Sequence, residues 1–115
     1  MKRLLFLVMV FAIAKLAVSQ DYIFWGDYTN GNIYRADVNG ENITVVASGY
    51  NQVRTVTVDN KNFRVYWAVG TQGVYSANFD GTGLVQILNY GTTIGRIEFD
   101  YLNDKIFFTE SFAGN

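Results

Sequence analysis

The sequence predicts an all-β protein made of repeated four-stranded antiparallel units. Half of the residues are hydrophobic and 17% are aromatic, a composition that favours strands over helices. An apolar and aromatic segment occurs three times, at residues 23–27, 65–69 and 106–110. Phe24 precedes Tyr66 by 42 residues, and Tyr66 precedes Phe107 by 41. This period is typical of the four-stranded blades of a β-propeller.

The first element, residues 1–19, is predicted to be the helix of a secretory signal peptide. Lys2 and Arg3 form a basic start, residues 4–14 are apolar, and small residues permit cleavage after Ser19. The alternative is an uncleaved anchor helix, but this apolar run is shorter than the roughly 20 residues that span a bilayer. Cleavage leaves six basic and ten acidic side chains, a net charge of −4. Residues 20–115 then form the repeats.

The first repeat is predicted to contain three strands joined by short hairpins. These strands are residues 22–26, 32–37 and 43–47. The connections contain Asn30-Gly31 and Asn39-Gly40, and both dipeptides tolerate the positive φ of a tight turn. If the strands of one unit are lettered a to d, this repeat supplies b, c and d.

The second repeat is complete, and the third is partial. Strands are predicted at residues 53–58, 64–69, 74–79 and 84–88, and then at 95–99 and 105–109. Asp80-Gly81 follows Asn39-Gly40 by 41 residues, and Asp59 and Asp100 each lie seven residues before the aromatic pair. The order of strands is therefore bcd, abcd, ab, an incomplete ring.

These motifs resemble the YWTD repeat, also called the low-density lipoprotein receptor class B repeat. The residues that carry the resemblance are Phe24, Trp25, Asp27, Arg35, Asp59, Tyr66, Trp67, Asp100, Phe107 and Phe108. In that family six repeats close into an extracellular propeller, and residues 22–115 correspond to about two and a third of them. The resemblance implies a YWTD-type β-propeller.

Three positions depart from the family pattern. Val69 stands where the first repeat has Asp27, and Ser76 stands where it has Arg35. The third repeat keeps an acid as Glu110 but has Phe108 in place of tryptophan. The resemblance implies that the acidic and arginine positions tie neighbouring blades together, so this tie is in doubt at the second repeat.

An incomplete ring leaves apolar faces and open strand edges that favour self-association. Two explanations fit. The chain is part of a longer propeller, or copies assemble, as three chains would to supply six blades. The strand at residues 105–109 would compete with residues 22–26 of the next copy, which favours the first explanation.

Loops b to c and d to a share one face of an antiparallel blade, and this face is the predicted protein-binding surface. Its candidate residues are Tyr28, Asn30, Tyr50, Asn51 and Tyr90. Tyrosine suits recognition because its ring offers contact area at low entropic cost. The alternative is that these are turn residues packed at the rim of a blade.

Other candidate sites are few. The sequon at Asn42 predicts glycosylation on the opposite face. The chain has neither cysteine nor histidine, which excludes zinc sites and catalytic triads built on them. Asp37, Asp59, Asp80 and Asp100 occur at turns, where an aspartate side chain accepts local hydrogen bonds. No cofactor or metal site is predicted.

The sequence therefore predicts a secreted, non-enzymatic protein-binding module that resembles part of a low-density lipoprotein receptor. Its expected partner is an extracellular protein ligand or co-receptor. The negative charge disfavours nucleic acid, and no membrane span is predicted. One alternative is a matrix component of nidogen-like type. Another is a metal-dependent propeller resembling lactone hydrolases, which needs ligands from more blades than this chain has.

Overall fold

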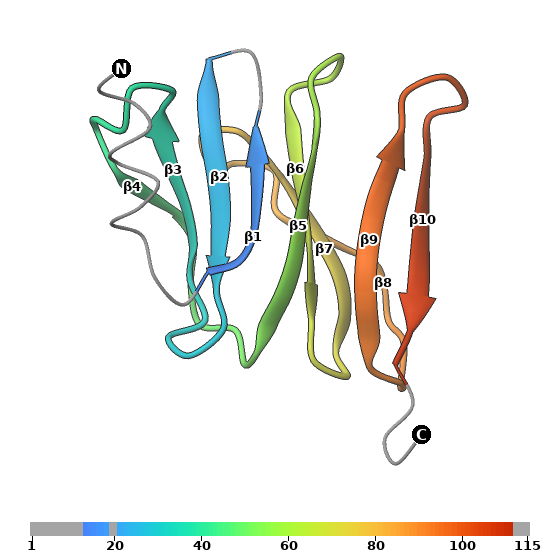
Figure 1. The fold of residues 1–115 in the computed structure, drawn as a ribbon. Helices are drawn as coiled ribbons and strands as arrows, with labels where there is room; N and C mark the ends of the chain where they lie inside the picture. The colour runs from blue at the N-terminus through green and yellow to red at the C-terminus, as the bar shows by residue number, and fades with distance from the viewer. Residues whose placement is uncertain (1–12, 19–20, 112–115) are drawn as a thin grey trace.

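The computed structural model describes residues 13–18 and 21–111, and this part of the chain contains ten strands and no helix (Figure 1). The strands are β1 (Ile13–Val18), β2 (Tyr22–Asp27), β3 (Ile33–Asp37), β4 (Thr44–Ala47), β5 (Val53–Asp59), β6 (Arg64–Val69), β7 (Gly73–Asn78), β8 (Val85–Leu88), β9 (Ile94–Asp100) and β10 (Lys105–Glu110). All nine predicted strands are present, with ends within one residue of the prediction. The all-β prediction is confirmed.

Consecutive strands pair antiparallel in three sheets that stand side by side (Figure 1). β1 to β4 form the first sheet, β5 to β8 the second, and β9 with β10 the third. The turns after β3 and β7 contain Gly40 and Gly81, whose φ angles are 87° and 90°. Glycine adopts this left-handed conformation without a steric penalty. The turns predicted at these two glycines are therefore confirmed.

A one-residue bulge recurs in the first strand of each sheet. The pairing register skips a residue after Ile13 in β1, after Val53 in β5, and after Ile94 in β9. A bulge bends a strand and increases its twist. Because the bulge occupies the same place each time, the three sheets are copies of one structural unit, as expected of propeller blades.

β1 differs from the prediction, which placed the end of a signal-peptide helix at these residues. β1 pairs with β2, and Ala17 lies opposite Phe24 and is buried in the core. The first sheet therefore has four strands rather than the predicted three. Residues 1–12 and Ser19 lie outside the described part, so cleavage after Ser19 stays a prediction.

The reason for this difference is visible in the sequence. Aliphatic residues at 13, 16 and 18 have the same spacing as Val53, Val56 and Val58 in β5. A short apolar run fits both a helix and a buried strand, and its pattern alone does not separate them. Pairing with β2 is a tertiary contact, and it selects the strand.

The paired aromatic residues place one ring on each side of a sheet, because successive side chains of a strand point to opposite faces. Phe24 and Trp67 are both fully buried in the cluster between the first and second sheets. Trp25, on the other side of β2, stacks on Tyr34 at 5.5 Å between ring centroids. On the far side of β6, Tyr66 stacks on Phe99 of the third sheet at 5.7 Å. The repeated aromatic pair therefore joins neighbouring sheets.

The third sheet ends in an exposed apolar surface. Phe107 of β10 occupies the position of Tyr66, but 60% of its area is exposed. Ile87 of β8 is 45% exposed, whereas Val46, at the same place in the first sheet, packs against the core between the first two sheets. The outer half of the second sheet has no strands of the third sheet to cover it.

Candidate functional site

The two ends of the sheets carry different connections. The loop face, at the bottom of Figure 1, consists of residues 28–32, 48–52, 70–72 and 89–93. The turn face, at the top, consists of residues 38–43, 60–63, 79–84 and 101–104. Protein binding was predicted on the loop face and glycosylation on the turn face.

Aspartate carboxylates close the connections on both faces. On the loop face, Asp27 accepts hydrogen bonds from the backbone of Thr29 and Asn30, at 2.9 and 3.0 Å, and from the Asn30 amide at 2.7 Å. The hydrogen bond from the backbone of Asn30 is the largest of the effects that hold the pKa of Asp27 below its ordinary value; burial opposes it, and the Asn30 amide and the Thr29 backbone add to the lowering. Asp27 therefore orders its own loop.

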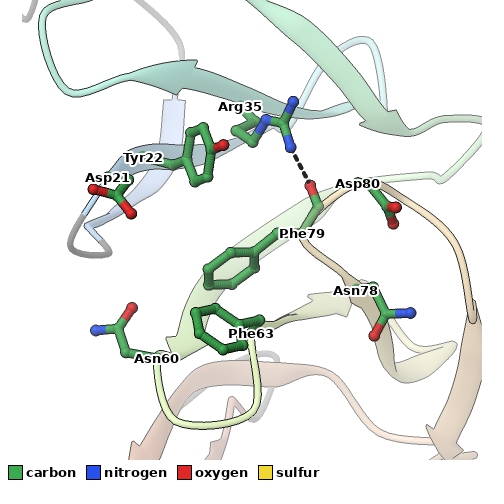
Figure 2. A pocket seen from close by; sticks show the side chains of 8 residues that line it. All are labelled: Asp21, Tyr22, Arg35, Asn60, Phe63, Asn78, Phe79 and Asp80. Carbon is green, nitrogen blue, oxygen red and sulfur yellow. Dashed lines mark hydrogen bonds between the residues drawn. The ribbon is translucent and has the colours of Figure 1, made fainter.

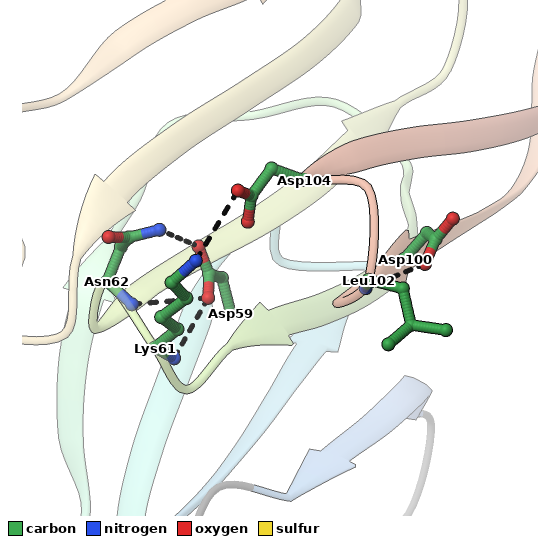
Figure 3. A network of polar contacts seen from close by, with 6 residues as sticks. All are labelled: Asp59, Lys61, Asn62, Asp100, Leu102 and Asp104. Atoms are coloured by element: carbon green, nitrogen blue, oxygen red, sulfur yellow. Dashed lines mark hydrogen bonds and ion pairs between the residues drawn. The ribbon is translucent and has the colours of Figure 1, made fainter.

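The same arrangement occurs on the turn face. Asp59 accepts hydrogen bonds from the backbone of Lys61 and Asn62, at 2.9 and 3.2 Å, and from the Asn62 amide at 2.8 Å (Figure 3). Asp100 accepts hydrogen bonds from the backbone of Leu102 at 2.9 Å and the Asn103 amide at 2.8 Å. The prediction that these carboxylates bond to local groups is confirmed.

Two further turn aspartates behave in the same way. Asp80 accepts hydrogen bonds from the hydroxyl and backbone of Thr82, at 2.6 and 3.0 Å, and the hydroxyl is the main reason that the pKa of Asp80 is lowered. Asp37 accepts one from the Asn42 amide at 2.7 Å. Asn42 is exposed, and its glycosylation stays a prediction.

Arg35 makes the tie between sheets that the family resemblance implied. Its Nη1 atom donates at 3.0 Å to the backbone oxygen of Phe79, which directly follows β7 of the second sheet. Its guanidinium carbon lies 4.5 Å from the centre of the Tyr22 ring. Arg35 thus crosses from the first sheet to the second while one of its faces is covered by an aromatic ring.

In the second repeat, an arginine is found on a different strand from the one that corresponds to the strand of Arg35. Arg64 donates to Ser76 Oγ at 2.8 Å, Asn78 Oδ1 at 2.9 Å and Gly83 O at 3.0 Å, all within or beside its own sheet. Ser76, at the position of Arg35, therefore becomes a partner of Arg64. The doubt about an arginine tie at this repeat is justified.

Other groups join the second and third sheets. The Tyr101 hydroxyl donates to Val58 O at 2.9 Å, and Lys61 lies 3.5 Å from Asp104 in an exposed ion pair (Figure 3). Sequence reasoning missed both contacts, because Tyr101, Lys61 and Asp104 are surface turn residues with no distinguishing pattern.

Three of the predicted binding residues are exposed on the loop face. Tyr28 is 42% exposed, and the guanidinium carbon of Arg54 lies 5.7 Å from its ring centre. Asn30 and Asn51 are exposed, although the Asn30 amide is held by Asp27. Tyr28 and Asn51 therefore offer the surface that the prediction requires.

Tyr50 and Tyr90 are half-buried and pack against the following sheet. The Tyr50 ring meets Trp67 at 5.6 Å and Tyr75 at 4.8 Å. The Tyr90 ring meets Phe108 at 5.3 Å, and its hydroxyl donates to Glu110. Burial raises the pKa of Tyr50, and the hydrogen bond to Glu110 raises that of Tyr90. Both rings therefore pack at the rim of a blade.

A pocket of about 500 Å³ opens on the turn face between the first and second sheets (Figure 2). It is lined by Asp21, Tyr22, Arg35, Asn60, Phe63, Asn78, Phe79 and Asp80. Sequence reasoning did not find it, because its walls come from separate segments. The sequence offered one signal, since Phe63 stands in the turn where the third repeat has Asp104, and the structure gives these two residues φ angles of 55° and 52°. Bulky residues rarely adopt this conformation.

The described part of the chain contains neither a metal-binding cluster nor a membrane-spanning helix. Within residues 13–18 and 21–111, no group of three or more histidine, cysteine, aspartate or glutamate residues could hold a metal ion. In the same part of the chain, no helix is long and apolar enough to cross a membrane.

Comparisons with known proteins show the fold but no family. No protein-family profile matches the chain, and no curated protein sequence matches it. A chain in the crystal structure of a nidogen/laminin complex shares 19% identity, with a TM-score of 0.77 over 83% of this chain. This chain spans only 39% of that one.

Two other solved structures share the arrangement. The computationally designed Ika4 protein has a TM-score of 0.60 at 20% identity, covering 77% of this chain and 55% of its own. An auxiliary nutrient binding protein from Bacteroides thetaiotaomicron has a TM-score of 0.59 at 14% identity, covering 78% of this chain and 23% of its own. The chain thus has an all-β fold of antiparallel propeller-type blades in an open arc.

Proposed function

We propose that this chain is a non-enzymatic extracellular module of YWTD-type repeats that binds another protein through its loop face. One observation carries the proposal: a chain with the same fold, at a TM-score of 0.77, belongs to a complex of nidogen with laminin. The predicted signal peptide supports an extracellular location.

The loop face supports this proposal through its exposed and ordered groups. Tyr28 offers an aromatic ring and Asn51 offers an amide, and the loop between β2 and β3 is held by the hydrogen bonds of Asp27. An ordered loop loses less conformational entropy on binding than a mobile one. Aromatic residues on ordered loops are common anchors of protein interfaces.

The absence of catalysis is part of the proposal. Asp27, Asp59, Asp80 and Asp100 all accept hydrogen bonds from their own connections. Such engaged carboxylates are poorly placed to act as general bases or metal ligands. An esterase assay with and without a chelator tests this point, and chelator-sensitive turnover would instead support the lactone hydrolase-like alternative.

Two partner classes fit the module. The first is a ligand or co-receptor of a low-density lipoprotein receptor-like protein, which the YWTD resemblance favours. The second is a matrix glycoprotein bound in nidogen-like manner, which the nidogen/laminin complex favours. The two classes differ in a measurable property, the affinity for laminin.

We expect Tyr28→Ala with Asn51→Ala to weaken binding of the chain to purified laminin by about tenfold, because the pair supplies the exposed contacts of the loop face. Surface plasmon resonance measures the affinity. Leu102→Ala is the matched control, since Leu102 is 93% exposed on the turn face. An unchanged affinity of the double variant would show that the loop face is not the interface. A chain that does not bind laminin would exclude the nidogen-like partner and leave the receptor-like class.

A further inference from the structure

We propose that the turn-face pocket between the first and second sheets receives an arginine side chain of a protein partner. The inference rests on the proposed protein-binding function and adds a second contact, on the face opposite Tyr28. It follows from the aromatic walls of the pocket, its excess of acidic groups and an unsatisfied acceptor at its edge (Figure 2).

Three aromatic rings form the apolar part of the pocket. Phe79 is 9% exposed and forms its floor. The Tyr22 ring meets Phe79 at 6.2 Å and an interplanar angle of 83°, and the Phe63 ring meets it at 5.9 Å and 90°. The two outer rings thus stand at steep angles on the floor. They can hold the carbon stem or the planar end of a long side chain between them.

Phe63 is placed there at a conformational cost. Its φ of 55° is matched by the 52° of Asp104, which occupies the same turn position in the third sheet. The turn therefore requires a left-handed residue, and aspartate, asparagine or glycine supplies one with less strain than phenylalanine. Phe63 is nevertheless 64% exposed, so burial does not explain its presence. A strained, exposed aromatic residue beside a pocket is consistent with a binding role.

The polar part of the pocket favours a cation that donates hydrogen bonds. Asp21 and Asp80 contribute two negative charges and Arg35 one positive charge, a net charge of −1 for the lining. Asn60 Oδ1 is buried without a hydrogen-bond partner. Asp21 and Asn60 lie on the same side of the pocket, at the left of Figure 2, and the rings of Tyr22 and Phe79 lie to their right. An unsatisfied buried acceptor lowers stability until a donor reaches it.

Arginine fits these features better than lysine or an apolar side chain. Its guanidinium is planar, stacks on aromatic rings, and carries several donors for carboxylate and amide oxygens. The pocket already contains such a contact, since Arg35 lies 4.5 Å from the centre of the Tyr22 ring. An apolar side chain would leave Asn60 Oδ1 without a donor. The volume of about 500 Å³ admits the arginine together with flanking residues of a peptide.

The first test titrates the full chain, carrying Asn42→Gln to remove the sequon, with the acetylated and amidated tripeptide Gly-Arg-Gly. Nuclear magnetic resonance should show saturable shifts at the amides of Asn60, Phe63 and Phe79. The control peptide replaces arginine with citrulline, which has nearly the same shape but no charge. We expect the citrulline peptide to bind about three- to fivefold more weakly, the range of one partly exposed charge contact. Equal binding of the two peptides, or no shift at these amides, would overturn the proposal.

The second test uses matched variants at the two equivalent turns. Phe63→Gly should abolish the shifts caused by the arginine peptide and leave the chain folded, since glycine suits the left-handed turn. Asp104→Gly makes the corresponding change in the third sheet and should leave binding of the peptide unchanged. Equal effects of the two substitutions would contradict a role for the Phe63 ring.

The result of the arginine-peptide tests does not depend on whether the loop face is a protein-binding interface. The Tyr28→Ala, Asn51→Ala variant should bind the arginine peptide like the unchanged chain. If laminin binds and the peptide does not, the pocket inference fails alone. If the peptide binds and the loop-face substitutions have no effect on any protein partner, the proposed interface fails and the pocket remains.

Discussion

At the scale of single residues, the spacing of an aspartate and an asparagine shapes the connections of this protein. Asp27 with Asn30, Asp59 with Asn62, and Asp100 with Asn103 each join through a carboxylate and an amide at 2.7 to 2.8 Å. The same carboxylates accept backbone hydrogen bonds that would otherwise need water. The motif therefore orders one connection on the loop face and two connections on the turn face.

We expect Asp59→Ala to lower the free energy of unfolding by about 1 to 3 kcal/mol, because it leaves the donors of Lys61 and Asn62 without their acceptor. Asp59 is 1% exposed, so water does not readily replace the lost acceptor. Urea unfolding followed by tryptophan fluorescence measures the change. Asp100→Ala removes the same motif from a more exposed turn and should cost less. Equal losses in the two variants would show that burial does not decide the effect.

At the scale of elements, β1 and the predicted signal peptide are alternative roles for the same residues. Cleavage after Ser19 would remove β1 and leave the edge of β2 unpaired. β1 nevertheless shares its bulge with β5 and β9, and it places Ala17 among the buried residues of the first core cluster. Residues 13–18 thus have the features of a structural strand.

A chain starting at residue 20 should unfold at lower urea than a chain starting at residue 13. The expected loss is about 2 to 4 kcal/mol, taking roughly 1 kcal/mol net for each lost backbone hydrogen bond of β1. Chemical unfolding of the two purified chains measures it, and N-terminal sequencing of the secreted product shows which of them occurs. Equal stabilities would mean that β1 contributes nothing to the fold.

At the scale of the whole molecule, the sheets form an arc with an uncovered end. Phe107 is 60% exposed, and Val85 and Ile87 of β8 are 47% and 45% exposed. Phe24, at the position of Phe107 in the first sheet, is fully buried because the second sheet covers it. The prediction of an outward apolar face is therefore confirmed at the third sheet. At the first sheet it holds for Val45, which is 54% exposed, but not for Trp25, which is 5% exposed.

We expect Phe107→Ser with Ile87→Thr to reduce self-association of the chain, because these substitutions make the uncovered end polar. Light scattering over a concentration series measures the average mass. Leu102→Ser is the control, since Leu102 is more exposed than either residue but lies at a turn tip. If both variants associate as the unchanged chain does, the open end is not the surface of self-association.

Much of this architecture could be predicted, and the candidate sites much less. The strands and the turns at Gly40 and Gly81 follow from local rules, namely β-branched and aromatic runs and residues that tolerate positive φ. The binding residues were chosen from loop chemistry, which correctly placed Tyr28 on an exposed surface. The same chemistry does not reveal that Tyr50 and Tyr90 pack on the aromatic residues of the next sheet.

The sequence by itself determined the repeat, because its period depends on the spacing of residues such as Phe24, Tyr66 and Phe107 along one chain. Only the tertiary structure decided that residues 13–18 form a strand, since an apolar segment takes its conformation from the edge with which it pairs. It also decided the pocket around Phe63, whose walls approach one another only when two sheets pack. Contacts between neighbouring sheets depend on which faces meet, and local sequence patterns do not encode that choice.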